Sequence, residues 1–356
     1  MRGGDYPFTV GKHLPLKLAE LEVAEGVMRI PDTQLKAVGY VCEVTSRSGD
    51  EIYSDPYATG FFVSVPCESP ELVGMEMYYF ATAKHVASDL KDREIAFTVN
   101  KVGGGITHEI WRIADTWFLH PTDKSADVAI VQVALRVGVV DIAPVSIVSF
   151  GLPERLRELN IGIGDDTHSI GLFSPFPGDG SNIPIVRYGN VSMMPAQVMP
   201  TELGPTEMYL VEARSIGGMS GSPVFVRPTL AFQVARHNSP PALGFLSGTG
   251  ETLLGMAHGH WDIKEEDINK PSFVHDRKRG VNYGIAMVVP ALKIYETIYQ
   301  PGLVAMRRDQ EKQFIKKQRA IPSPDSPKAD REGPFTQEDF EAALRKTTRK
   351  IVPDKE

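Results

Sequence analysis

Apolar residues in the middle of the chain come in short, often alternating runs that are separated by Gly, Pro, Asn and Asp. Eleven such runs lie between about residues 35 and 300, at positions 35–44, 60–65, 77–83, 94–99, 126–133, 169–173, 188–193, 208–213, 222–226, 253–259 and 283–289. Runs of this length between turn-forming residues are typical of β-strands, and few helical periods interrupt them. The pattern predicts an all-β sandwich or barrel.

Helical spacing is confined to a few segments. We expect short helices at 154–160 and 290–300; the second begins at Pro290 and should close the folded domain. From about residue 305 the chain is charged and then rich in Pro and Ser, which predicts a linker over 301–334. A capping-box-like start at Thr336 predicts a helical tail over 335–356, and residues 1–34 are an N-terminal extension.

Composition narrows the class of protein. The 356 residues carry a net charge of −7 and have no dense block of Lys and Arg, so nucleic acid is not expected as the main partner. No apolar run has the length of a signal peptide core or of a membrane helix, so we expect a cytoplasmic protein with no membrane partner. In a reducing cytosol Cys42 and Cys67 should be free thiols. No Cys/His spacing is that of a metal site, and neither a metal nor another cofactor is expected.

The charge of the tail has the opposite sign. Residues 306–356 carry 13 basic and 10 acidic side chains, which makes this segment +3 and the rest of the chain −10. The segment is a candidate for docking a partner or tethering the chain, and a frayed terminus without a role is the alternative.

Small residues gather in the stretch RSIGGMSGSPVFV at 214–226. Ser220 lies between Gly218 and Gly221, where glycine lets the backbone approach closely and adopt positive φ. The N–H groups of Gly218 and Ser220 are then the natural pair to form an oxyanion hole beside a nucleophilic serine. The alternative is an ordinary glycine-rich turn before the strand at 223–226.

A serine nucleophile needs a base, and the base needs a carboxylate to orient it. His85 stands where the apolar run of YYFATAKHV ends and a helical turn can begin. Asp127 enters the alternating run of SADVAIVQV, where an ionised side chain is costly unless it is paired. Asp115 and Asp123 are competing carboxylates without that buried context.

Taken together, the stretches TGFFVSV…YYFATAKHV, SADVAIVQV, YGNVSM, IGGMSGSPVFV, LLGMAHGH and YGIAMVVPALKI resemble the successive signatures of chymotrypsin-like (trypsin-fold) serine peptidases. The likeness covers about residues 35–300 and is greatest to the bacterial branch with a Gly-x-Ser-Gly-Ser-Pro signature. It implies two six-stranded antiparallel β-barrels, at about 35–145 and 160–300, with a closing C-terminal helix and here a short helical tail. It also implies His85 as general base, Asp127 as its orienter, Ser220 as nucleophile, and the N–H groups of Gly218 and Ser220 as oxyanion donors.

Two residues depart from that family's pattern. Lys84 replaces the small residue before the histidine, and on an alternating strand end it should point away from His85. Met219 replaces the acid that zymogen-activated members carry before the serine, so activation through that acid is not expected.

The resemblance also suggests where substrate would bind. It places residues 256–260, with His258 and Gly259, along the substrate backbone, and Arg214 to Gly217 in the primary pocket wall. Two donors, Arg214 and His258, favour Glu, Asp or Gln before the cut, although Arg214 could equally turn to solvent.

These features predict a serine endopeptidase that acts on polypeptide substrates through an acyl-enzyme. Two alternatives remain: a catalytically silent peptidase-fold protein that binds peptides, and esterase or acyltransferase chemistry from the same three residues. The α/β-hydrolase form of the latter is disfavoured because the alternating βα pattern and the order Ser, Asp, His are missing.

Overall fold

The structure is a computed structural model, and it describes residues 30–49, 51–111, 117–136, 138–201, 203–213, 218–229, 252–264, 280–320 and 342. The chain divides into two units, Met1–Ile30 and Pro31–Glu356. The second unit holds every element described below.

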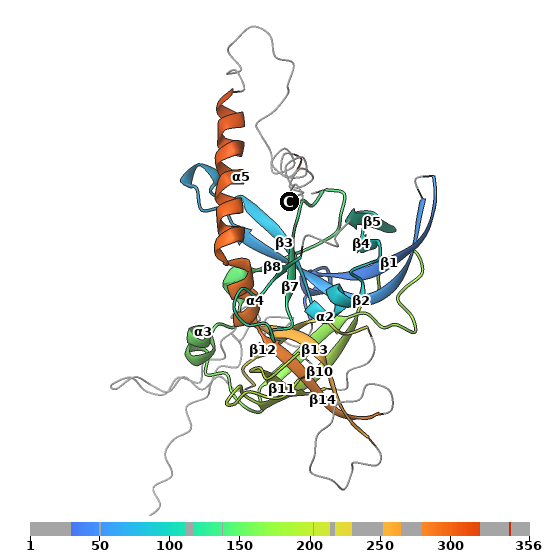
Figure 1. The fold of residues 1–356 in the computed structure, drawn as a ribbon, viewed down its shortest axis with the longest axis vertical. Coiled ribbons are helices and arrows are strands. Elements are labelled where there is room, and N and C mark those ends of the chain that lie inside the picture. Colours follow the sequence, from blue (N-terminus) through green and yellow to red (C-terminus); the bar gives the residue numbers. More distant parts are fainter. Residues whose placement is uncertain are drawn as a thin grey trace, which may run out of the picture. The chain divides into compact units, whose positions relative to one another are not determined.

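The N-terminal half of this unit is an eight-stranded sheet (Figure 1). Its strands follow the order β5-β4-β1-β2-β3-β7-β6, and β8 pairs with β2 in parallel. Their bounds are β1 (Val38–Ser48), β2 (Glu51–Pro66), β3 (Glu76–Thr82), β4 (Ile95–Asn100), β5 (Ile106–Trp111), β6 (Phe118–Leu119), β7 (Ala129–Val133) and β8 (Val145–Ser146). Among the described residues the path is open between β5 and β6, so the expected first six-stranded barrel is not confirmed.

The C-terminal half is a closed six-stranded barrel in the order β10-β11-β14-β13-β12-β9. The strands are β9 (Asp166–Gly171), β10 (Ile185–Met193), β11 (Tyr209–Glu212), β12 (Pro223–Arg227), β13 (Thr252–Lys264) and β14 (Gly280–Pro290). Alternating apolar side chains such as Val211, Val224, Leu254 and Val288 form its buried core. The prediction of a second six-stranded barrel is therefore confirmed.

Each of the eleven apolar runs falls on a strand: β1 to β4, β7 and β9 to β14. The pattern missed β5, β6 and β8. β6 and β8 have two residues each, too few to show a period, and β5 carries a His–Glu pair in its middle.

The helices are short apart from one. They are α1 (Asp32–Leu35), α2 (Lys84–Asp89), α3 (Pro153–Glu158) and α4 (Ala291–Ile298), with 3-10 turns η1 (Pro70–Leu72) and η2 (Ile147–Ser149). α3 and α4 confirm the two helices expected in the domain. Within the described parts of the chain, no helix has the length and apolar character needed to cross a membrane.

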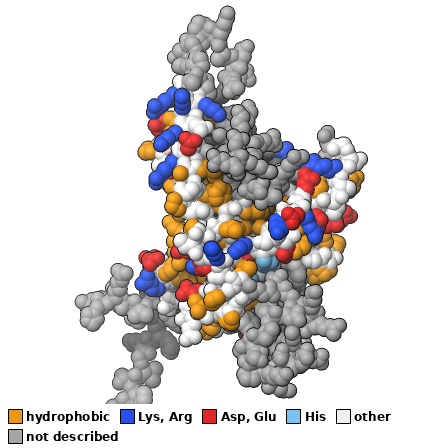
Figure 2. All heavy atoms as spheres, viewed as in Figure 1, with side chains coloured by type: hydrophobic (Ala, Val, Ile, Leu, Met, Phe, Trp, Pro, Cys, Tyr) orange, Lys and Arg blue, Asp and Glu red, His pale blue; other side chains and the backbone are white. Residues whose placement is uncertain are grey.

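The long helix α5 (Pro301–Ala320) is a correction, because the sequence predicted a linker that starts at residue 301. Along one face Leu303, Arg307, Gln310, Glu311 and Phe314 are buried. In Figure 1 α5 continues beyond α4 beside the first sheet, and in Figure 2 Lys and Arg side chains occupy its outer face.

Three of the five buried side chains of α5 are polar, which hides the helix from an apolar pattern, but each has partners. Arg307 Nη1 donates to Tyr79 Oη at 3.1 Å and to Ile298 O at 2.8 Å. Gln310 and Gln132 exchange amide hydrogen bonds of 2.8 and 3.0 Å. The carboxylate of Glu311 accepts two backbone N–H bonds of 2.9 Å from residues 68 and 69. The rest of the predicted linker and the tail lie outside the described residues, apart from Ala342.

Candidate active site

The pairing of two strands brings His85 to Asp127. β3 ends at Thr82, which pairs with Ala129 at the start of β7. Because the pairing is antiparallel, the residues after β3 and before β7 leave the sheet side by side. His85 lies in the first turn of α2, and its Nδ1 is 2.7 Å from Asp127 Oδ2. Its backbone N–H donates to Asp127 Oδ1 at 2.8 Å.

Asp127 is fully buried and still ionised. Burial by itself raises the pKa of its carboxyl, but hydrogen bonds and charge from His258 and His85 outweigh it and hold the pKa well below the usual range. An ionised carboxylate only accepts hydrogen bonds, so the imidazole of His85 carries its proton on Nδ1. In the neutral ring Nε2 is then unprotonated and can act as a base.

The loop that carries Ser220 requires its glycines. Gly218 and Gly221 have φ of +92° and +84°, a region that side chains disfavour. A Cβ on Gly221 would lie 2.0 Å from Thr59 O, and one on Gly218 would lie 2.4 Å from Ser174 Oγ. Within the described part of the chain, the N–H groups of Gly218 and Ser220 have no hydrogen-bond partner, as donors to an oxyanion must.

Thr59 in β2 fixes this loop, a role that the sequence analysis missed. Its hydroxyl donates to Gly218 O at 2.7 Å and accepts the N–H of Leu172 at 2.8 Å. Its backbone N–H donates to Ser220 O at 3.1 Å, and its carbonyl accepts the hydroxyl of Thr82 at 2.8 Å. One buried threonine of the first sheet therefore holds the serine loop of the barrel.

The hydroxyl of Ser220 donates to the backbone carbonyl of His258 at 3.3 Å. Among the described residues it makes no hydrogen bond to His85. Such bonds are often long or absent without substrate and form only in the complex.

His258 in β13 is placed differently from its expected role at the substrate. Its imidazole is buried, and its Nδ1 is hydrogen-bonded to Asp127 Oδ2, the oxygen that His85 also uses. The two rings are 5.5 Å apart between centroids and nearly perpendicular. His258 thus contacts Asp127 through its side chain and Ser220 through its carbonyl. The neighbouring Gly259 is half-buried, whereas Arg214 and Gly217 lie outside the described residues.

Asp123 organises the loop that leads to Asp127. It accepts hydrogen bonds from the N–H groups of Ser125 and Ala126 and forms an ion pair of 2.9 Å with Lys293 of α4. Partial burial raises the pKa of Asp123, but the hydrogen bonds from Ser125 and Lys293 and the charge of Lys293 outweigh this effect and lower the pKa to about 2. The competing carboxylate therefore has a structural role, and Asp115 lies outside the described residues.

Lys84 and Met219, the two residues that depart from the family pattern, each have a described contact. Lys84 Nζ donates to the carbonyl of Lys124 at 2.7 Å, so its charge is engaged there. Met219 is buried, with its sulfur 3.9 Å from Ser222 Oγ.

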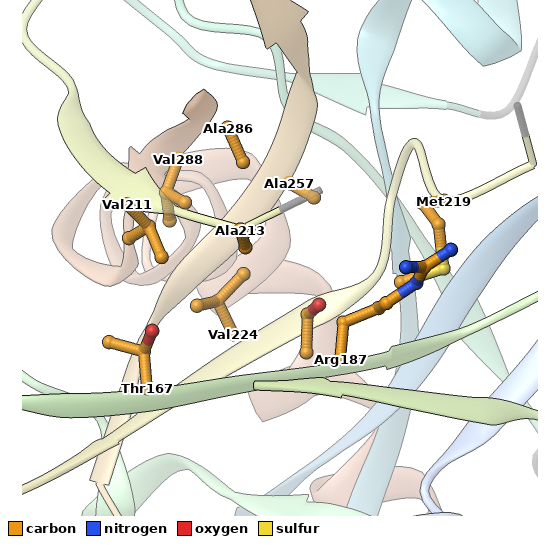
Figure 3. A pocket seen from close by; sticks show the side chains of 10 residues that line it. Thr167, Arg187, Val211, Ala213, Met219, Val224, Ala257, Ala286 and Val288 are labelled. Atoms are coloured by element: carbon orange, nitrogen blue, oxygen red, sulfur yellow. The ribbon is translucent and has the colours of Figure 1, made fainter. Parts of the chain in front are cut away.

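A small cavity lies inside the barrel beside the serine loop (Figure 3). Its volume is about 20 Å³, enough for one water molecule. Met219 and Ala257, the residues before Ser220 and His258, line it together with Thr167 and Arg187. Thr167 Oγ1 and Arg187 Nε are buried and have no hydrogen-bond partner within the described part of the chain.

The two histidines and the aspartate of this site are also residue types that bind metal ions. Among the described residues His85, Asp127 and His258 are the only group whose donor atoms lie close enough to hold one. Their Nδ1 atoms, however, already donate to the carboxylate, so a metal would have to displace those protons. The arrangement is that of a hydrogen-bond network.

Comparisons with known proteins give only distant likenesses. No family model matches, and no curated protein matches. Among solved structures, the MamO protease domain from Magnetospirillum magneticum has 16% identity and a TM-score of 0.43, covering 75% of this chain and 98% of that one. The HtrA-type protease AlgW with a decapeptide has 14% identity and a TM-score of 0.42, covering 76% and 66%. The Rv3671c protease from M. tuberculosis, active form, has 14% identity and a TM-score of 0.37, covering 75% and 81%. All three are named as proteases, but likenesses this weak carry no argument about the present chain.

Proposed function

We propose that the chain is a serine endopeptidase with His85 as general base, Asp127 as its orienter and Ser220 as nucleophile. The observation that carries the proposal is the buried, ionised Asp127, which holds Nδ1 of His85 at 2.7 Å. That contact leaves Nε2 as the basic nitrogen. His258 connects this pair to Ser220, and two N–H groups of the serine loop have no partner among the described residues.

Each step follows from these atoms. Ser220 Oγ attacks the scissile carbonyl carbon while its proton passes to His85 Nε2. The carbonyl electron pair moves to oxygen, where the N–H groups of Gly218 and Ser220 would stabilise the negative charge. Collapse breaks the C–N bond as His85 protonates the leaving amine. Water then attacks the acyl-serine ester, gives a proton to His85 and releases the acid, and that proton returns to Ser220.

We also propose that the peptidase prefers Glu, Asp or Gln in the substrate residue before the cut, but for a different reason than in the sequence analysis. The Nδ1–H of His258 is used by Asp127, so the preference now rests on Arg214, the other donor of the two. Peptides that differ only in Glu, Gln, Ala or Lys at that position test it. The preference is refuted if the Ala or Lys peptide is cut fastest.

The proposal is tested by intact-mass analysis after exposure to a fluorophosphonate. Ser220 should displace fluoride and form one phosphonyl adduct. Ser220→Ala should form none, and Asp127→Asn should react about 10⁴-fold more slowly. Ser222→Ala is the matched control, because this buried serine lies two residues away, and it should label like wild type. An adduct that survives in Ser220→Ala would show that another residue is the nucleophile.

A peptide-binding protein without catalysis is the second candidate. It is favoured by one observation, namely that the Ser220 hydroxyl is turned to the His258 carbonyl and not to His85. Absence of the adduct on well-folded wild type, together with peptide binding, would support this candidate.

We also propose a cytoplasmic location, supported by the free thiols of Cys42 and Cys67. Titration of the denatured, natively purified chain should find two thiols. Docking of a partner through the tail is proposed only for residues after 320, because α5 packs on the domain.

A further inference from the structure

We propose that His258 is a positioning residue of the candidate triad, a second imidazole that fixes the catalytic carboxylate and the resting serine together. The inference rests on the proposed function, which it deepens. It assigns His258 to the protein's own catalytic geometry instead of to the substrate.

The first step is the carboxylate. Asp127 is fully buried and accepts three N–H groups: the backbone N–H and Nδ1 of His85, and Nδ1 of His258. Two of these donors share Oδ2, one from each side of the site. A buried charge needs all of its partners, because a lost partner is not replaced by water. Without the His258 donor the carboxylate would be held only by His85, the residue that it must orient.

The second step is the tautomer. Since the ionised carboxylate only accepts, His258 carries a proton on Nδ1 just as His85 does. The two ring N–H groups then point at one oxygen, Oδ2 of Asp127. The two rings are nearly perpendicular, with 5.5 Å between their centroids, so each reaches this oxygen from its own direction.

The third step is the serine. The carbonyl of His258 accepts the Ser220 hydroxyl at 3.3 Å, a length at which the bond is weak. The hydroxyl can leave this acceptor for His85 when substrate binds. The same residue thus sets the resting position of the nucleophile and the orientation of the base.

The substitutions that test this are His258→Asn and His258→Leu. Asn places an N–H donor where Nδ1 stands, and Leu has nearly the same shape without a donor. Both keep the backbone carbonyl for Ser220. The reaction measured is fluorophosphonate labelling, whose dependence on reagent concentration separates the maximal rate from the half-saturating concentration. Ring N–H signals in the far-downfield proton NMR spectrum provide a readout that needs no activity.

We expect two downfield ring N–H signals in wild type, both absent in Asp127→Asn and one absent in either His258 variant. His258→Leu should lower the maximal labelling rate by roughly 10- to 100-fold at unchanged half-saturation, and His258→Asn should recover most of it. Equal rates in wild type and His258→Leu, or a single N–H signal in wild type, would overturn the proposal. If wild type shows both signals but no labelling, the proposed function fails and the carboxylate-positioning role of His258 stands.

Discussion

The serine loop is held in part by the hydroxyl of Thr59, and the contribution of this hydroxyl to the free energy of unfolding can be worked out from its two hydrogen bonds. Thr59→Val replaces this hydroxyl by a methyl group of the same shape. It leaves the buried N–H of Leu172 and the partly buried carbonyl of Gly218 without their partner. Each such orphan costs about 1–3 kcal/mol, so we expect the free energy of unfolding to fall by about 2–6 kcal/mol.

Thr167 offers a matched control. It is also buried on a strand, but its hydroxyl has no hydrogen-bond partner within the described residues. Thr167→Val should therefore be neutral or slightly stabilising, because it removes an unsatisfied polar atom. Thr59→Ser, which keeps the hydroxyl and loses one methyl, should cost about 1 kcal/mol.

The measurement is urea denaturation followed by tryptophan fluorescence and by circular dichroism, with coincident transitions as the criterion for two-state analysis. Fluorophosphonate labelling of the same variants shows whether the loop is displaced, and only Thr59→Val should label more slowly. Equal losses of stability in Thr59→Val and Thr167→Val would refute the reasoning, since among the described residues only the Thr59 hydroxyl has hydrogen-bond partners.

Three further outcomes are expected. Gly221→Ala should abolish labelling and lower the melting temperature, because its Cβ would lie 2.0 Å from Thr59 O; wild-type labelling would contradict this. Asp123 has its pKa lowered from 3.8 to about 2 in the folded chain, so its stabilisation is present above pH 4 and is lost as the pH falls towards 2. Asp123→Asn should flatten that part of the stability–pH curve, and an unchanged slope would count against the contact. Truncation after residue 320 should leave labelling and melting unchanged, whereas truncation after 305 should lower the melting temperature, since it removes the buried face of α5; indistinguishable melting of the two would refute the packing role.

The strands could be predicted because their apolar alternation survives in the sequence, and the long helix could not. α5 packs on the domain with a face that includes Arg307, Gln310 and Glu311, and an apolar pattern reads these residues as exposed. Their burial depends on partners such as Tyr79 and Gln132, more than a hundred residues away. Long-range pairs of this kind leave no periodic signal.

In the candidate site, too, the sequence indicates which polar residues are buried but not which partners they have. Asp127 was identified because a charge in an apolar strand requires a partner, and the structure supplies two imidazoles. The same reasoning applied to Thr59 before GFFVSV would have singled it out, and applied to His258 in LLGMAHG it would have predicted a buried partner in place of a substrate contact, since each is a polar side chain next to an apolar run. A buried polar residue in a strand indicates a partner, although the sequence alone does not say which one.

The serine loop is held by hydrogen bonds to Thr59. Met219 is buried beside the loop without a charge, so no ion pair at this position is needed to shape it. The loop is instead fixed by Thr59, which the pairing of β2 with β1 puts in place opposite Tyr40 as the first sheet forms. Its conformation therefore depends on folding and on the contact between sheet and barrel. For the proposed reaction, the change that remains is the movement of the Ser220 hydroxyl from the His258 carbonyl to His85.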